Sequence, residues 1–318
     1  MKKINNHASQ KKHRKFTCPL PVKKGECIGL IAPAGSIINK KNFLDGIGIL
    51  EKKGYKVKYN PRIINGTGYL AGSDLERSEE FNRLWSDPEV KGLVAARGGY
   101  GSMRLLDLID MKQIRKNPKI LIGFSDLSVL LNAIHQKTGL VTYHGPVVTT
   151  LGSIDNKSLT SFFDTLNGKS SGFQIRIRFK ILKKGAARGI LLGGNLTTLI
   201  HTIGTPYEPP WHQAVLFIED IGEAPYRLDR LLTHLSQAGR LQKIKGLILG
   251  TFTDDGKKEN AQMQRTVRKR VMELLAEYNI PIWADFPVGH SRRNITLPVG
   301  IEVEMDSSKN ILRFQWNP

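Results

Sequence analysis

Short apolar runs alternate with helical stretches along this chain, and this alternation restricts the fold more than any other feature. The run 27–32 ends in a turn that leads into helical periodicity, and the run 119–123 leads into a helix over 127–137. A further apolar run, 92–96, ends in a glycine-rich turn. Such alternation is typical of a mostly parallel sheet covered by helices. We therefore predict an α/β fold with a flavodoxin-like, parallel-sheet N-terminal domain.

The second half of the chain continues this pattern and then changes at its end. Further strands are predicted at residues 187–192, 215–218, 246–250, 295–298, 300–304 and 311–314. The last three are short and are expected to pair antiparallel. Leucines spaced between Leu228 and Leu235 form one apolar helical face. This half predicts a C-terminal α/β domain with mixed short strands.

Composition divides the chain into four parts. The start is basic, and the stretch from about 150 to 184 is polar, rich in Ser, Asn, Lys and Gly, with less apolar periodicity. We predict a basic N-terminal arm over 1–24, an N-terminal domain over 25–150, a linker over 151–185 and a C-terminal domain over 186–318. A length of 318 residues fits two domains of ordinary size.

Positive charge is concentrated at the start of the chain. The formal net charge is +20, and eight cationic residues precede the first acid, Glu26. A solvated or weakly anion-seeking tail is the interpretation we favour, and an arm for nucleic acid or anionic lipid is the alternative. Beyond the arm the basic residues are dispersed, whereas a nucleic-acid-binding module needs them clustered with aromatics. We therefore expect no nucleic-acid partner and keep such a module as a rival hypothesis.

Cysteines, histidines and apolar runs restrict the chemistry and the compartment. Only Cys18 and Cys27 are present, without CxxC spacing, so neither a disulfide framework nor a zinc–thiolate site is expected. The histidines lack ligand-like spacing and no nucleotide fingerprint occurs, so we expect no metal and no cofactor. No apolar run approaches 18 residues, and no signal-peptide pattern follows the basic start. These features favour a cytoplasmic protein without membrane insertion.

A serine follows one predicted strand, in the segment Ile122-Gly-Phe-Ser-Asp126. On a tight strand-to-helix turn such a serine is lifted out of the sheet, and N–H groups at the helix start can stabilise an oxyanion. The alternative is that Ser125 only caps the next helix. The segment is not G-x-S-x-G, because Leu127 stands at the position of the last glycine, so an α/β-hydrolase assignment is not supported.

Two further strand ends carry groups that a serine nucleophile needs. A serine requires a histidine base, and the histidine requires a carboxylate that fixes its tautomer. Glu219 ends an apolar strand, with Glu223 as a nearby competitor, and His290 lies in a loop. Each could instead be structural, and so could the glycine-rich turn 97–101, whose backbone N–H groups could face an oxyanion. Because functional groups gather at the carboxyl ends of parallel strands, we expect these segments to meet.

Together these segments resemble the serine LD-carboxypeptidases, the muramoyl-tetrapeptide carboxypeptidase family that also includes microcin-immunity peptidases. The resemblance spans roughly residues 26–302. The matching segments, in order, are Ile31-Ala-Pro-Ala-Gly-Ser36, Ala96-Arg-Gly-Gly-Tyr-Gly101, Ile122-Gly-Phe-Ser-Asp126, Gly193-Gly-Asn-Leu196, Phe217-Ile-Glu-Asp220, Glu223-Ala-Pro-Tyr-Arg-Leu-Asp-Arg230, and Gly289-His290 through Leu297-Pro-Val-Gly300.

The resemblance implies a role for each of these groups. By motif, Ser125 would be the nucleophile, His290 the general base and Glu219 the carboxylate that orients the base. The oxyanion hole would use the backbone N–H groups of Asp126 and Gly99. The implied substrate is a cytoplasmic muropeptide, cleaved between the L-centre of its third residue and a terminal D-alanine during cell-wall recycling. The family also suggests a homodimer.

A carboxypeptidase must hold a free carboxylate, which a guanidinium does bidentately. The candidate arginines in the motif segments, which the sequence does not rank, are Arg97, Arg227, Arg230, Arg292 and Arg293. A rival hypothesis assigns the same catalytic residues to a different substrate, an aminoacyl-nucleotide antibiotic whose amide the enzyme would hydrolyse. That site would offer an aromatic platform for the base, for which Trp211 or Tyr207 could serve.

Overall fold

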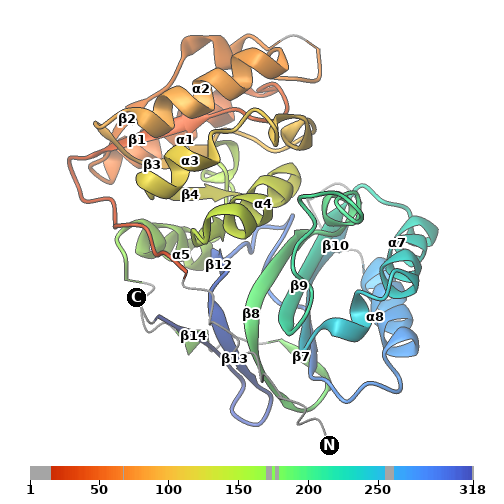
Figure 1. The fold of residues 1–318 in the computed structure, drawn as a ribbon. Coiled ribbons are helices and arrows are strands. Elements are labelled where there is room, and N and C mark those ends of the chain that lie inside the picture. The colour runs from red at the N-terminus through yellow and green to blue at the C-terminus, as the bar shows by residue number, and fades with distance from the viewer. Residues whose placement is uncertain (1–15, 67, 170–173, 176–178, 255–260, 317–318) are drawn as a thin grey trace, which may run out of the picture.

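Two β-sheets with their covering helices make up the molecule (Figure 1). The structure is a computed structural model of the 318-residue chain, and it describes residues 16–66, 68–169, 174–175, 179–254 and 261–316. The predicted α/β class is confirmed.

The first sheet is built mainly from the N-terminal half. Its strands run in the order β12 (Leu297–Val299), β5 (Thr142–His144), β4 (Ile120–Gly123), β3 (Val90–Ala95), β1 (Cys27–Ile31) and β2 (Lys56–Lys58). The five strands of the N-terminal half are parallel, as predicted. Strand β12 comes from the other half and pairs antiparallel with β5. The C-terminal half therefore completes the N-terminal sheet.

Helices cover both faces of this sheet. Those that contribute buried side chains are α1 (Lys40–Lys52), α2 (Asp74–Ser86), α3 (Met111–Lys116), α4 (Ser128–Thr138) and α5 (Asn156–Leu166). The first and last pack on one face, and the other three pack on the opposite face. Helix α2 begins with the capping box that the sequence spacing predicts, because Ser73 and Glu76 each accept the other's backbone N–H. Short 3₁₀ turns join these elements: η1 (Pro61–Ile64), η2 (Ser102–Leu105), η3 (Ser125–Leu127) and η4 (Val148–Thr150).

The second sheet is larger and mixed. Its order is β6 (Gln174–Ile175), β14 (Ile311–Gln315), β13 (Glu302–Asp306), β8 (Ala186–Asn195), β9 (Ala214–Ile221), β10 (Gly246–Thr253), β11 (Ile282–Ala284) and β7 (Lys180–Lys183). The four strands from β8 to β11 are parallel, and the outer strands are antiparallel. This confirms the predicted mixed C-terminal sheet.

The helical elements of this half are α6 (Leu196–Ile200), α7 (Pro225–Gln237), the 3₁₀ turn η5 (Leu241–Lys243) and α8 (Ala261–Leu274). Helix α7 buries Leu228, Leu232 and Leu235 on the predicted apolar face. Within the described ranges, no helix combines the length and the apolar character that crossing a membrane requires.

Helix α4 fastens the two halves to each other. The Asn132 side-chain amide donates to the carbonyl oxygen of Gly193 at 2.9 Å, and the N–H of Asn195 donates to the hydroxyl of Ser128 at 2.9 Å. A Cβ atom on Gly194 would lie 2.2 Å from that hydroxyl oxygen, so only glycine allows this approach. The start of α4, next to Ser125, is therefore fixed against the end of β8.

Part of the predicted basic arm belongs to the folded body. Val22 is fully buried and donates its N–H to the carbonyl oxygen of Leu166 at 2.8 Å, and Thr17 bridges Leu140. Apolar residues within 16–22 account for this packing. The rest of the predicted arm, residues 1–15, lies outside the described residues.

The predicted linker 151–185 contains helix α5. Asp155 caps the helix by accepting the N–H of Ser158 at 2.8 Å, and Phe162 and Leu166 are fully buried. The segment is polar on average, but its few apolar residues fall at helical spacing and form one apolar face of the helix. Helix α5 therefore packs on the first sheet, whereas β6 and β7 of the same segment belong to the second sheet, and the four-part domain division stays a prediction.

We expect Phe162→Ala to destabilise the protein strongly, because it leaves a cavity under α5. Removing a buried phenylalanine costs about 3–5 kcal/mol of unfolding free energy. Chemical denaturation followed by circular dichroism measures the change. Thr160→Ala, on the exposed side of the same helix, is the control and is expected to change the free energy by less than about 0.5 kcal/mol. Equal effects of the two substitutions would contradict the buried placement of α5.

Candidate active site

Ser125 lies directly after β4, at the first position of η3. Its φ is 65°, in the left-handed region, which costs a residue other than glycine about 1–2 kcal/mol. A Cβ atom on Gly98 would lie 2.8 Å from the Ser125 Cβ, so the glycine turn must lack a side chain where the serine approaches it. A strained serine against a glycine turn is typical of a functional position rather than of a simple helix cap.

Glu219 and His290 are in direct contact. His290 Nδ1 lies 2.6 Å from Glu219 Oε2, and the carboxylate is fully buried. Gly289 has φ of 114°, and a Cβ there would lie 2.7 Å from Glu219 Oε2. The glycine thus permits the close approach of the loop that carries the histidine. The geometry fits an imidazole whose tautomer and orientation a carboxylate fixes.

Phe124 connects this pair to the serine. Its ring centroid lies 4.7 Å from that of His290, so the histidine packs against the residue that precedes Ser125. The N-terminal half supplies Ser125, and the C-terminal half supplies Glu219 and His290. The residue before Ser125 and the histidine loop therefore contact each other through Phe124, at the joint between the two sheets.

The electrostatics of Glu219 follow from its surroundings. Burial alone would raise the pKa of this carboxyl, but the adjacent His290 and the nearby His144 hold the pKa at about 2. The carboxylate therefore stays ionised, as an orienting group must. The neighbouring Asp220 behaves differently, because burial and the charge of Glu219 raise its pKa to about 6.

Asp220, which follows Glu219 in β9, stabilises the neighbouring turn. Its carboxylate accepts hydrogen bonds from the Asn195 amide at 2.8 Å and from the N–H and hydroxyl of Thr197 at 2.9 and 2.8 Å. These bonds hold the start of α6.

Glu223, the carboxylate that competes with Glu219 in the sequence, lies 3.6 Å from Arg227. Glu219 is therefore the carboxylate that contacts the histidine.

A cavity of about 520 Å³ opens at the serine, and both halves of the chain line it. From the N-terminal half its wall includes Gly99, Ser125 and Asp126, and from the C-terminal half it includes Thr197 and His201. The two predicted oxyanion residues therefore share a cavity with the predicted nucleophile. Backbone N–H groups around such a serine can stabilise the negative charge of a tetrahedral intermediate.

The side chain of Asp126 has a separate role. It is buried and accepts the N–H of Ser102 at 2.7 Å, so it fastens the turn that follows the glycines. Burial raises the pKa of this carboxyl. The sequence-based role for Asp126 concerned only its backbone.

None of the predicted arginines is among the described residues that line this cavity. Arg97 is half-buried and donates to the carbonyl oxygen of Ser36 at 2.6 Å, and burial lowers its pKa. Arg227 and Arg230 lie on the exposed side of α7 against the ring of Tyr226. The exposed Arg292 and Arg293 lie beside the start of α5.

Two cationic or titratable side chains at the cavity escaped the sequence analysis. Arg104 follows the glycine turn and binds Asp74 Oδ2 through Nη2 at 2.7 Å, and His201 lies at the end of α6. Arg104 lies in η2, and no local sequence pattern marked it. No signal in the sequence marked His201.

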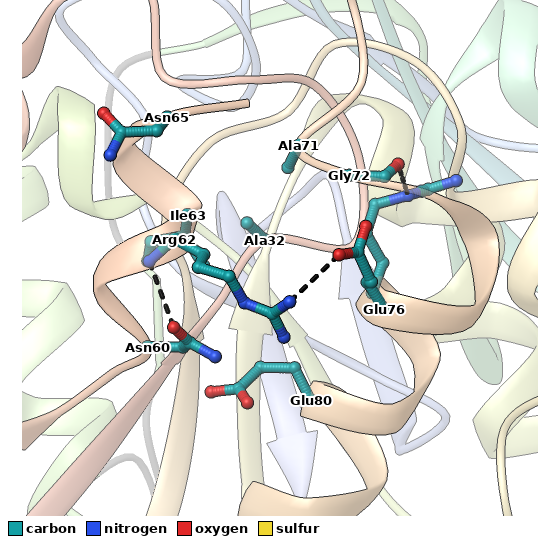
Figure 2. A pocket seen from close by; sticks show the side chains of 10 residues that line it. Ala32, Asn60, Arg62, Ile63, Asn65, Ala71, Gly72, Glu76 and Glu80 are labelled. Atoms are coloured by element: carbon teal, nitrogen blue, oxygen red, sulfur yellow. Dashed lines mark hydrogen bonds and ion pairs between the residues drawn. The ribbon is translucent and has the colours of Figure 1, made fainter. Parts of the chain in front are cut away.

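A second cavity, of about 290 Å³, lies between η1 and α2 (Figure 2). Arg62 reaches across it to Glu76 at 3.0 Å, and Glu80 is bonded to Arg83. Its charged groups thus have partners of opposite charge, and neither Ser125 nor His290 is among the described residues that line it. Among the described residues, no three His, Cys, Asp or Glu side chains gather as a metal ion requires.

Comparison with known proteins covers both halves. The LD-carboxypeptidase N-terminal domain matches residues 28–145, and the LD-carboxypeptidase C-terminal domain matches residues 188–305. A probable murein peptide carboxypeptidase of Bacillus subtilis is 36% identical over 300 residues, covering 92% of each chain.

Two solved structures share the fold. A muramoyltetrapeptide carboxypeptidase from Oxalobacter formigenes has a TM-score of 0.77 and 31% identity, over 91% of this chain and 97% of that chain. The microcin C7 self-immunity protein in complex with glutamyl sulfamoyl guanosine has a TM-score of 0.85 and 25% identity, over 94% of this chain and 98% of that chain. The resemblance inferred from the motifs is thereby confirmed, and the chain belongs to the LD-carboxypeptidase family.

Proposed function

We propose that this enzyme is a serine carboxypeptidase that releases the terminal D-alanine from murein tetrapeptides, with Ser125 as nucleophile. The observation that carries the proposal is the 2.6 Å contact between buried Glu219 and His290, packed beside the strained turn of Ser125. The names of the Bacillus and Oxalobacter relatives support a murein peptide as substrate.

In the proposed reaction each of these groups has one role. His290 accepts the hydroxyl proton of Ser125 while the oxygen attacks the carbonyl of the LD-amide bond. Backbone N–H groups of Gly99 and Asp126 stabilise the resulting oxyanion. His290 then gives its proton to the leaving amine of D-alanine, and water hydrolyses the acyl-enzyme with the same histidine as base. Glu219 stays ionised and stabilises the imidazolium.

The terminal carboxylate of the substrate needs a cation at the cavity. Arg104 is the guanidinium that the cavity offers, and its contact with Asp74 fixes the direction of its fork. We therefore replace the sequence-based candidates Arg97, Arg227 and Arg230 by Arg104 in this role. A guanidinium that is already oriented loses less side-chain entropy when it binds.

The antibiotic-hydrolysing alternative has structural support in the immunity-protein match but not in the two predicted aromatic residues. Trp211 is buried and donates its indole N–H to Glu208 at 2.7 Å. Lys137 covers the ring of Tyr207 at 5.1 Å from its centroid. Neither ring is among the described residues that line the cavity at Ser125, whereas the exposed Tyr100 is. Assaying a tetrapeptide beside an aminoacyl sulfamoyl adenylate separates the two substrates.

Three finer statements rest on the family resemblance. We propose that the enzyme works in the cytoplasm, that its reaction serves cell-wall recycling, and that it forms a homodimer. The nucleic-acid hypothesis depends on the basic start of the chain, of which residues 1–15 lie outside the described part. A variant without residues 1–15 keeps the packed Val22 and isolates any binding that this segment contributes.

Replacing the nucleophile tests the mechanism. We expect Ser125→Ala to lower turnover of a tetrapeptide that ends in D-alanine by at least about 10⁴-fold, with little change in Tm. Mass spectrometry follows the loss of one alanine. Ser153→Ala, which removes a hydroxyl on an exposed turn, is the matched control and is expected to keep full activity. A fully active Ser125→Ala enzyme would end the proposal.

The backbone strain at the same position gives a stability prediction. Because φ is 65° at Ser125, we expect Ser125→Gly to be more stable than Ser125→Ala by about 1 kcal/mol, although both lack the nucleophile. Urea denaturation of the two variants measures the difference. A glycine variant less stable than the alanine variant would show that the serine backbone is not strained.

Carboxylate recognition is tested at Arg104. We expect Arg104→Ala to raise KM for the free peptide about 10-fold or more and to leave KM for its C-terminal amide nearly unchanged, because only the carboxylate needs the guanidinium. Arg227→Ala, on the exposed side of α7, is the control and is expected to alter neither value. An equal rise of KM for both peptides would contradict this role of Arg104.

A further inference from the structure

We propose that His144 is a positioning residue that holds the second oxygen of the Glu219 carboxylate while the first oxygen orients His290. This inference rests on the proposed serine mechanism and adds a fourth side chain to it. The carboxylate would thus lie between two imidazoles, one from each half of the chain.

The location of His144 supports this role. It is the last residue of β5, the strand next to β4, which leads into Ser125. Its side chain is fully buried, and its Nε2 lies 3.9 Å from Glu219 Oε1. The two oxygens of one carboxylate therefore face two different histidines.

The hydrogen-bonding groups at this contact have no other partner within the described part of the chain. Both ring nitrogens of His144 and the Oε1 atom of Glu219 are buried, and none of the three makes a hydrogen bond to a described residue. A neutral imidazole carries one N–H, and a buried donor without an acceptor is strongly disfavoured. Glu219 Oε1 is the acceptor within reach, since a shift of about one ångström would close the bond. Hydrogen bonds of catalytic groups often tighten in this way when substrate binds.

Aromatic packing restricts the movement of the His144 ring. Its ring makes edge contacts with Phe124 and Phe217, at centroid distances of 5.9 and 5.1 Å. Phe124 also contacts His290 at 4.7 Å. One phenylalanine thus holds both imidazoles, so a movement at the nucleophile's turn reaches both sides of the carboxylate.

His144 does not act on the substrate itself. It has no exposed surface and is not among the residues that line the cavity at Ser125. Its effect must therefore pass through Glu219. Among the described residues, Asp220 is a further charged group near this carboxylate, and it accepts hydrogen bonds from Asn195 and Thr197.

The chemical consequence concerns the proton affinity of the Glu219–His290 pair. A donor on Oε1 stabilises the ionised carboxylate and stops it from rotating away from His290. Without that donor the Glu219–His290 pair binds a proton more tightly, whether the carboxylate or the imidazole carries it. The acid limb of the kcat/KM profile then moves to higher pH.

His144→Phe and His144→Gln form the test pair. The phenylalanine keeps the aromatic packing and removes both nitrogens, and the glutamine keeps an N–H donor. We expect His144→Phe to lower kcat about 10- to 100-fold, the range of a hydrogen bond to a charged group, with KM little changed. Its acid limb is expected to move up in pH, and His144→Gln is expected to restore part of both effects. Tyr143→Phe, one residue earlier on the same buried strand, is the control.

A substrate-independent readout separates this inference from the proposed function. Diisopropyl fluorophosphate labels a serine that a histidine activates. If the wild type is not labelled at Ser125, the proposed function fails. If the wild type is labelled and His144→Phe is labelled at the same rate with the same pH dependence, the role of His144 is overturned.

A measurement on the wild type covers the case in which both variants fail to fold. Nitrogen-15 NMR of the histidine side chains identifies the protonated ring nitrogen of His144. We expect its proton to resonate far downfield, as in a hydrogen bond to a carboxylate. A proton shift typical of an unbonded imidazole would overturn the inference.

Discussion

A buried negative charge is the constraint around which this molecule is arranged. Glu219 has no exposed surface, and an isolated carboxylate in such a place would take up a proton. His290 at 2.6 Å and His144 on the opposite side keep it ionised. The two histidines belong to different halves of the chain, so the charge is tolerated only when the two sheets are assembled. The proposed function and the tertiary assembly thus involve the same group.

The glycines near the site show what this arrangement requires of the sequence. Gly98 leaves room for the serine, and Gly289 leaves room for the glutamate beneath the histidine loop. At both positions a Cβ would lie within 2.8 Å of a side chain of the proposed catalytic group. Ser125 itself has φ of 65°, a conformation that glycine would adopt without strain. A serine there lowers the stability of the fold through backbone strain, and such strain is common where an active site requires one orientation of a side chain.

The features that could be predicted from the sequence are those that depend on local residue patterns. Apolar strands predicted the α/β fold, and strand-end motifs pointed to Glu219 and His290, which are in contact, and to Ser125, the proposed nucleophile. The sequence did not predict Arg104 or His144, because neither forms a local pattern: Arg104 lines the cavity, and His144 lies beside Glu219 across the joint of the sheets. Helix α5 was missed for a compositional reason, since its apolar face is carried by few residues in a polar segment.

The joint between the halves decides how substrate can enter. Helix α4, which begins just after Ser125, is fastened to β8 by bonds from Asn132 and to Ser128, and β12 completes the first sheet from the second half. A hinge at this joint would break buried hydrogen bonds and would expose the Glu219 charge at the same time. Catalysis by hinged closure of two domains is therefore disfavoured by the fold. The open cavity of about 520 Å³ already reaches the serine, so the peptide can bind to a site that is assembled before it arrives.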